Sequence, residues 1–170
     1  MSDLELVERL LLSALLGGLL GLEREWRQKS AGLRTNILIA MGSTLFTMMS
    51  IDVSAGSGGD STRIASGIVT GIGFLGAGAI MRTGAGVKGL TTAAMIWVNA
   101  AVGVAVGGGE YRLAVIATAV ALVVLILLNP VENLIDRLLP KRPNDVDATG
   151  AGPSEEGAPG PSPQAPGDRP

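Results

Sequence analysis

The sequence predicts an all-α integral membrane protein, a bundle of about five transmembrane helices with the N-terminus outside and the C-terminus in the cytoplasm. The 18 residues Ile64–Met81, which would form the third span, carry no charge and five glycines. Gly89–Gly109 and Leu113–Val131, the fourth and fifth spans, are also uncharged, and a bilayer span needs about 17 to 25 mainly apolar residues. Hydrophobic residues make up 47% of the chain and charged residues 16%, which also favours a membrane protein.

The chain contains no cysteine and no histidine. This composition excludes disulfides, thiol chemistry and metal sites built from thiolate or imidazole ligands. Any metal would need oxygen ligands, which suit hard cations such as Mg²⁺, but no metal site can be assigned from the pattern. No cofactor is expected, and the net charge of −2 gives no indication of nucleic-acid binding.

The first two spans are shorter and need their flanking residues. The apolar run Leu10–Leu22 extends back through Leu4 to reach the length of a span. A signal peptide is disfavoured because the N-terminal residues are acidic and no cleavage site of small residues follows the run. The second span, Asn36–Ile51, would be about 24 Å long at about 1.5 Å per residue.

Glycines give the third span two smooth faces. Gly67, Gly71 and Gly78 share one face, whereas Gly73 and Gly76 fall roughly opposite. Small residues let helix backbones approach closely in a membrane. We therefore expect close neighbours on both sides of the third span and a central position for it in the bundle.

Small residues recur on two other spans. Ser13, Gly17 and Gly21 follow one another at helical spacing on the first span, and Gly103 and Gly107 do so on the fourth. The fifth span has no glycine and is almost wholly aliphatic, so we expect it at the lipid-facing periphery.

Basic residues indicate the orientation and divide the chain into two parts. If the segment after the first span is cytoplasmic, ten of the 13 basic residues lie inside and three lie outside, in agreement with the positive-inside rule. Residues 1–138 would form the transmembrane domain. Residues 139–170, rich in proline and glycine, cannot bury apolar area and should form a disordered cytoplasmic tail.

Polar side chains form stripes on two spans. The second span carries Asn36, Ser43, Thr47 and Ser50, and the fourth carries Thr92, Asn99 and Gly103. Hydrogen bonding between helices explains such stripes and is the favoured interpretation. A polar path or small-ion site between these helices is the alternative, because polar groups at membrane depth tend to face an interior or a cavity.

A charged cluster follows the first span at once. Glu23 and Arg27 are four residues apart and could pair on a continuing helix. An anchor at the membrane surface explains the basic residues Arg27 and Lys29, but it explains the carboxylates of Glu23 and Glu25 less well, because acidic residues contribute little to topology.

Five motifs resemble the membrane domain of the MgtC/SapB family. They are GLEREW (Gly21–Trp26), AGLRT (Ala31–Thr35), Asp60 with Arg63 at the start of the third span, GIGFLGAGAI (Gly71–Ile80) and GLTTAAMIWVNAAVG (Gly89–Gly103). The resemblance covers about residues 4–128. Longer members continue into a folded cytoplasmic domain, whereas this chain ends in its Pro/Gly-rich tail, and Ser61 stands where the family often has proline.

The resemblance implies a multi-pass protein of the bacterial inner membrane with a regulatory or accessory role in adaptation to low magnesium and, in some members, a link to virulence. The expected partners are the lipid bilayer, which the apolar spans require, a second copy of the chain, because five short helices enclose little volume, and, as the resemblance implies, a membrane protein such as the ATP synthase or a magnesium transporter. Carried over by position, the expected functional polar network consists of Glu23, Arg24, Glu25, Arg34, Thr35, Asp60, Arg63, Thr91, Thr92 and Asn99.

Two other functions compete with this one. A small ion transporter or channel would use the polar stripes of the second and fourth spans. An intramembrane enzyme is not expected, because the sequence offers no histidine, no cysteine and no compact pairing of a nucleophile with a base.

Overall fold

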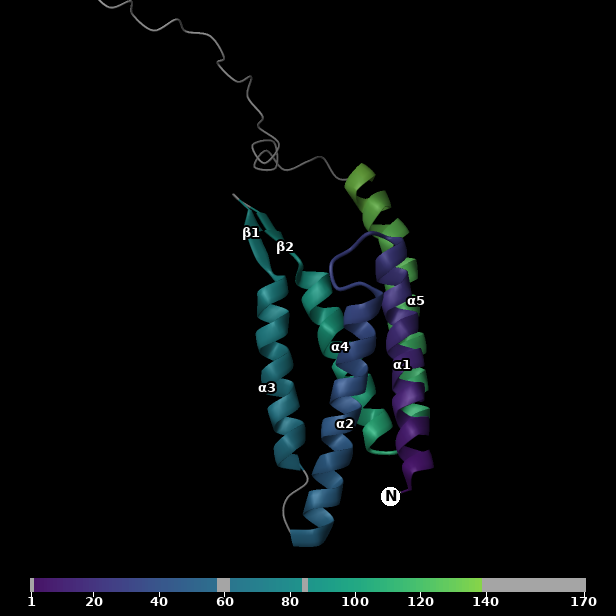
Figure 1. The fold of residues 1–170 in the computed structure, drawn as a ribbon. Helices are drawn as coiled ribbons and strands as arrows, with labels where there is room; N and C mark the ends of the chain where they lie inside the picture. The colour runs from purple at the N-terminus through teal and green to yellow at the C-terminus, as the bar shows by residue number, and fades with distance from the viewer. Residues whose placement is uncertain (1, 58–61, 84–85, 139–170) are drawn as a thin grey trace, which may run out of the picture.

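A computed structural model describes residues 2–57, 62–83 and 86–138. It contains five helices, α1 (Asp3–Trp26), α2 (Leu33–Ser57), α3 (Thr62–Ala79), α4 (Leu90–Gly107) and α5 (Tyr111–Leu138). Consecutive helices run in opposite directions, so the α1–α2 connection and the C-terminal end of α5 lie at the same end of the bundle (Figure 1). The predicted helical membrane bundle is thus confirmed in its class.

Three of these helices contain segments long and apolar enough to cross a membrane, namely Leu33–Gly56, Leu90–Gly107 and Tyr111–Leu128. Within α3 the apolar stretch among the described residues is the shorter Ala65–Ala79. The predicted total of five spans and the outward N-terminus stay predictions.

Helix α1 is capped at its start and is held against α4 and α5 by the side chain of Arg9. The Ser2 side chain accepts a hydrogen bond from the Glu5 backbone N–H at 3.2 Å, which caps the helix. Arg9 pairs with Glu5 one turn before it, and its Nη1 donates to the Gly107 carbonyl at 2.6 Å. The guanidinium also lies 5.9 Å from the centre of the Tyr111 ring. One side chain therefore ties α1 to the C-terminal end of α4 and the start of α5.

Glycines bring α1, α2 and α4 into backbone contact. A Cβ added at Gly17 would lie 2.7 Å from the Ala40 Cβ and 2.8 Å from the Asn36 carbonyl of α2. A Cβ at Gly107 would lie 2.7 Å from the Thr44 carbonyl. These distances are too short for any larger side chain, so the close packing that small residues predict on the first and fourth spans is present.

The central helix is α4, not α3. Helix α4 contacts all four other helices, and its buried residues include Val102 and Val106, which pack with Leu16 of α1 and Ala114 of α5. Helix α3 stands at the side of the bundle (Figure 1), and its residue Ile72 is buried beside Ile96 of α4.

The prediction of a central third span is therefore wrong for a single copy of the chain. A Cβ added at Gly67, Gly71, Gly73 or Gly78 would have no neighbouring atom within 4 Å, whereas Gly76 meets Ala93 of α4. Glycine spacing reveals a smooth helix face, but it does not reveal which neighbour covers that face.

A short β-hairpin that the all-α prediction did not include joins α3 to α4. Strands β1 (Met81–Thr83) and β2 (Gly86–Lys88) pair antiparallel, with Met81 opposite Lys88. The turn back into α4 requires a glycine, because Gly89 has φ +92° and a Cβ there would overlap the Ala79 carbonyl.

Helix α5 is peripheral, as predicted. Only 11% of its segment Tyr111–Leu128 is buried. The buried side includes Ala114 and Thr118, and the Thr118 hydroxyl bonds to the Ala114 carbonyl of its own helix at 2.8 Å. Most of the other aliphatic side chains of this segment are exposed, as expected for a helix that faces lipid.

Candidate functional site

A buried polar cluster joins α1, α2 and α4 near the α1–α2 connection. It consists of the buried residues Arg24, Asn36, Thr92 and Asn99, together with Ser30, which is exposed at the edge of the cluster. Arg24 is 4% exposed, and its Nη2 donates to the Thr92 Oγ1 of α4 at 3.1 Å. The Ser30 Oγ lies 3.1 Å from the same Thr92 oxygen. The hydroxyl of Thr92 thus connects α4 to α1 and to the α1–α2 loop, both of which are more than 60 residues before it in the sequence.

The two asparagines form the other half of the cluster. Asn99 Nδ2 donates to the Asn36 backbone carbonyl at 2.6 Å and lies 3.1 Å from Asn36 Oδ1. Asn36 Nδ2 in turn donates to the carbonyls of Ala31 at 2.5 Å and Gly32 at 3.0 Å. These bonds hold α4 against the first turn of α2 and fix the loop before it.

Two buried atoms of the cluster have no hydrogen-bond partner within the described residues, the Arg24 Nε and the Asn99 Oδ1. Arg24 lies two residues beyond the predicted first span. Burial lowers the pKa of its guanidinium from the usual value, whereas the adjacent Glu23 carboxylate raises it. Buried polar atoms are normally paired, so these two atoms mark the part of the cluster that the helices do not satisfy.

The carboxylates of the charged cluster have partners other than Arg24. Arg27 Nε lies 2.5 Å from Glu23 Oε1, which confirms the predicted pair at four-residue spacing. Glu25 Oε2 accepts a hydrogen bond from the Leu33 backbone N–H at 3.0 Å. Glu25 therefore satisfies one of the free N–H groups at the start of α2.

The predicted functional network is only partly assembled. Arg24, Thr92 and Asn99 come together in the buried polar cluster, with Glu23 and Glu25 beside it. Arg34, Thr35 and Thr91 are exposed, and Asp60 lies outside the described residues. Arg63 is exposed at the start of α3, which lies at the other end of the bundle (Figure 1).

Within the described ranges, no group of three or more histidine, cysteine, aspartate or glutamate residues could hold a metal ion.

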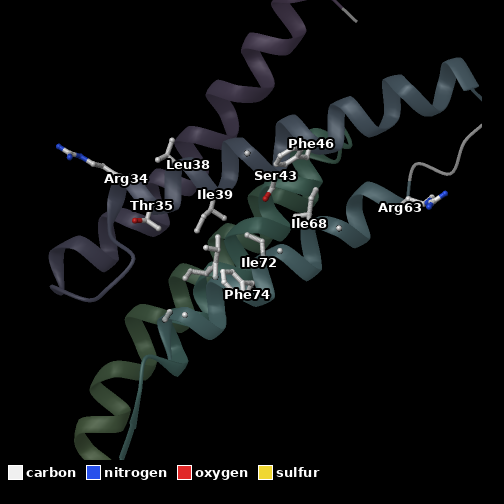
Figure 2. A pocket seen from close by; sticks show the side chains of 17 residues that line it. Arg34, Thr35, Leu38, Ile39, Ser43, Phe46, Arg63, Ile68, Ile72 and Phe74 are labelled. Carbon is white, nitrogen blue, oxygen red and sulfur yellow. The ribbon is translucent and has the colours of Figure 1, made fainter. Parts of the chain in front are cut away.

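Three of the remaining predicted residues line a groove between α2 and α3. The groove has a volume of about 1190 Å³, and its walls include Arg34, Thr35 and Arg63 as well as apolar side chains such as Phe46 and Phe74. Arg34 and Arg63 lie at opposite ends of this α2–α3 groove (Figure 2). The sequence-based network therefore divides between a buried polar cluster and an open groove.

Sequence reasoning missed some residues of the site. Asn36 belongs to a predicted polar stripe but not to the predicted network, although it is the partner of Asn99. Thr44 Oγ1 donates to the Gly103 carbonyl at 2.8 Å, and its helical spacing with Asn36 was an available signal. Ser30 lies in a loop, where no periodicity exists to point toward Thr92.

Comparison with known proteins identifies the family. The MgtC family model matches residues 10–134. The chain is 50% identical over 129 residues to Protein MgtC of Salmonella typhimurium, which covers 76% of this chain and 54% of the relative. It is 48% identical over 122 residues to Protein MgtC of Brucella abortus, which covers 72% of this chain and 50% of the relative.

An uncharacterised protein of Synechocystis is 46% identical over 128 residues, covering 75% of this chain and 54% of its own length. The chain thus spans about half the length of these curated relatives. No solved structure matches it. A family model over most of the chain, together with relatives at this identity, establishes that the chain belongs to the MgtC family.

Proposed function

We propose that this protein is a non-enzymatic regulatory or accessory protein of the bacterial inner membrane that serves adaptation to low magnesium. It acts through contact with a partner membrane protein, for which the ATP synthase and a magnesium transporter are candidates. Membership of the MgtC family supports this proposal, since the low-magnesium role is the one that the family resemblance implies.

The pairing of polar side chains across helices is the observation that carries the proposal. Arg24 bonds to Thr92, Asn99 to Asn36 and Thr44 to the Gly103 carbonyl. These groups fasten α1, α2 and α4 together and are therefore occupied in structural bonds. A packed bundle of this kind favours a protein that binds a partner over one that conducts ions.

Growth under magnesium limitation tests the proposed role. A bacterial strain deleted for its MgtC-family gene should recover growth in low magnesium when this chain is expressed. A chain that accumulates in the membrane to normal levels without restoring growth at any magnesium concentration would contradict the proposal.

Arg34 offers the sharpest variant in that assay. Its side chain is exposed and forms no salt bridge with another described residue, so its guanidinium is free to contact a partner. Arg34→Lys keeps the positive charge that topology requires but loses the bidentate fork of arginine. We expect impaired growth in low magnesium with unchanged membrane abundance.

Lys29→Arg is the matched control, because it changes a nearby exposed cation without removing its charge, and it should grow normally. Wild-type growth of Arg34→Lys across a magnesium titration would leave Arg34 with a topological role alone.

Ion transport is the second candidate function, and the unpaired atoms of the buried polar cluster favour it. The Asn99 Oδ1, on the predicted fourth span, and the Arg24 Nε, just beyond the predicted first span, are buried without a partner in the described part of the chain. Polar groups within a membrane, such as the Asn99 amide, often mark ion pathways. Purified protein in liposomes, assayed for magnesium and proton flux, separates the two functions. A clear flux that Asn99→Ala abolishes would establish transport and overturn the regulatory proposal.

A further inference from the structure

The α2–α3 groove is lined by glycine on both walls. Gly67, Gly71 and Gly78 of α3 and Gly42 of α2 all line it, and a Cβ added at any of them would meet no atom within 4 Å. The glycines of α1 and α4, by contrast, press against α2. The same type of residue is thus buried by a helix elsewhere in the bundle and left uncovered here.

An uncovered glycine face is costly without a neighbour. Glycine in a helix interior is less favourable than alanine by about 0.8 to 1 kcal/mol per residue. A helix face toward lipid recovers none of this cost, whereas close approach of another helix backbone does. The groove therefore has the surface expected for contact with a helix.

A serine in the wall of the groove points to the same occupant. Ser43 of α2 is 3% exposed, lines the groove, and lies between Ile39 and Ile68 in Figure 2. Its hydroxyl lies at the groove surface and takes no part in the hydrogen bonds found among the described residues. An unpaired hydroxyl in an apolar environment is unfavourable, and a lipid chain has no group to pair with it. A closely packed helix does, because its backbone carbonyls become reachable where glycine leaves them uncovered.

We propose that α3 of a second copy of this chain fills the α2–α3 groove, so that the protein forms a two-fold symmetric dimer. Copies inserted with the same topology are related by an axis along the membrane normal. Helix α3 is itself one wall of the groove. A two-fold axis beside it therefore brings the α3 helices of the two copies into contact, and each α3 also contacts the α2 of the other copy. The contact is self-complementary and closes at two copies, with helix axes about 8 to 10 Å apart.

Two further features of the groove are complementary between the two copies of such a dimer: an exposed aromatic ring and a pair of opposite charges. Phe74 is 81% exposed and stands at the groove in Figure 2, where its ring can fill the space above the glycines of the other copy. Asp52 near the end of α2 and Arg63 at the start of α3 are both exposed, and neither has a salt bridge among the described residues. The dimer brings Arg63 toward the partner's Asp52.

Cysteine crosslinking in membranes tests the dimer directly, because the chain has no cysteine of its own. Gly71→Cys should form a disulfide-linked dimer on mild oxidation, since groove-facing residues of the two copies lie near the axis and a disulfide needs Cα atoms about 4.4 to 6.8 Å apart. Gly67→Cys and Gly78→Cys should behave in the same way. Gly73→Cys is the matched control, because it lies on the same helix and is equally uncovered but does not line the groove.

A chain that stays monomeric with cysteine at all three groove positions would overturn the proposal, and the groove would then hold lipid or a helix of another protein. Equal crosslinking of Gly73→Cys would also overturn it, because that result indicates random collision. Neither readout depends on magnesium or on growth, so the dimer and the proposed function can fail separately.

Gly71→Leu supplies a second measurement. Its side chain should not disturb the single copy, because no atom lies within 4 Å of a Cβ there, but it would occupy the space of the partner's helix. We expect the dissociation constant, measured by energy transfer between labelled copies in membranes, to rise about fivefold to a hundredfold. Gly73→Leu should leave it unchanged. An unaltered dissociation constant in Gly71→Leu would contradict the proposed interface.

Discussion

Asn99 shows how single residues hold this bundle together. Its side chain is fully buried on α4, and its amide nitrogen bonds to both the backbone and the side chain of Asn36 on α2. The Asn36 side chain in turn donates hydrogen bonds to the loop carbonyls of Ala31 and Gly32. One amide thereby determines how α4 sits against the start of α2.

Replacing Asn99 with alanine should weaken the bundle measurably. Hydrogen bonds between membrane helices contribute about 0.6 kcal/mol on average and at most about 1.7 kcal/mol, so we expect a loss in the free energy of unfolding within this range. Reversible unfolding in bilayers or detergent measures it. Val98→Ala is the control, because Val98 is exposed on the same helix, and equal losses in both variants would show that the Asn99 bonds contribute nothing.

The polar stripes made this contact predictable, whereas the partner of Arg24 was not. Asn36 and Asn99 each belong to a stripe with helical periodicity, and two such stripes are expected to face each other. Arg24 stands among four charged residues, and sequence favours a carboxylate partner for it. The structure gives it the Thr92 hydroxyl, 68 residues away, whereas Glu23 pairs with Arg27 and Glu25 with the start of α2.

At the scale of helices, glycine serves two different purposes. On α4, Gly103 and Gly107 let the backbone of α2 approach, and a Cβ at Gly103 would overlap the Ala40 carbonyl. On α3, Gly67, Gly71 and Gly78 leave a groove within the single copy. The helix that packs most widely is α4, which carries buried residues along its whole length.

Gly103→Leu should therefore reduce the amount of folded protein, whereas Gly73→Leu should not. Overpacking a close contact typically costs about 1 to 3 kcal/mol, and the contact at Gly103 involves backbone atoms that cannot move aside easily. Fluorescence-detected size-exclusion chromatography of both variants at equal expression measures the folded fraction. Similar behaviour of the two variants would mean that the α2–α4 contact is more tolerant than its geometry indicates.

The length of the apolar runs predicted where the helices lie. The spacing of the glycines was a poorer predictor of which helices pack against each other. The apolar runs that begin near Asn36 and Leu113 fall within α2 and α5, because a run of apolar residues constrains the helix directly. The hairpin after α3 escaped prediction, since two strands of three residues each give too short a pattern to recognise. The position of α3 escaped it because periodicity describes one helix at a time.

The whole molecule has two distinct ends. The α1–α2 connection, the β-hairpin and the end of α5 lie together at one end, and the start of α1 lies at the other (Figure 1). Among the described residues, the basic residues predicted to be cytoplasmic belong to the first group of segments. The alternation of helix direction therefore agrees with the alternation of charge along the sequence.

Cysteine labelling tests the orientation of these ends. Gly108→Cys, in the exposed turn between α4 and α5, should react with an impermeant maleimide added to intact cells. Ser30→Cys, in the α1–α2 connection, should react only after the inner face is opened. The unsubstituted chain should not react at all, because it contains no cysteine, and the reverse pattern at the two sites would require the N-terminus to be inside.

The bond between Arg9 and Gly107 has a consequence for biosynthesis. These residues are 98 positions apart, and at about 5 to 20 residues per second the ribosome needs about 5 to 20 s to make the second after the first. During that interval α1 already carries the Arg9 guanidinium, but its acceptor on α4 does not yet exist. Glu5, one turn away, is present from the beginning and pairs with Arg9 in the finished protein. The Glu5–Arg9 pair thus gives the nascent helix its own counter-ion until α4 arrives.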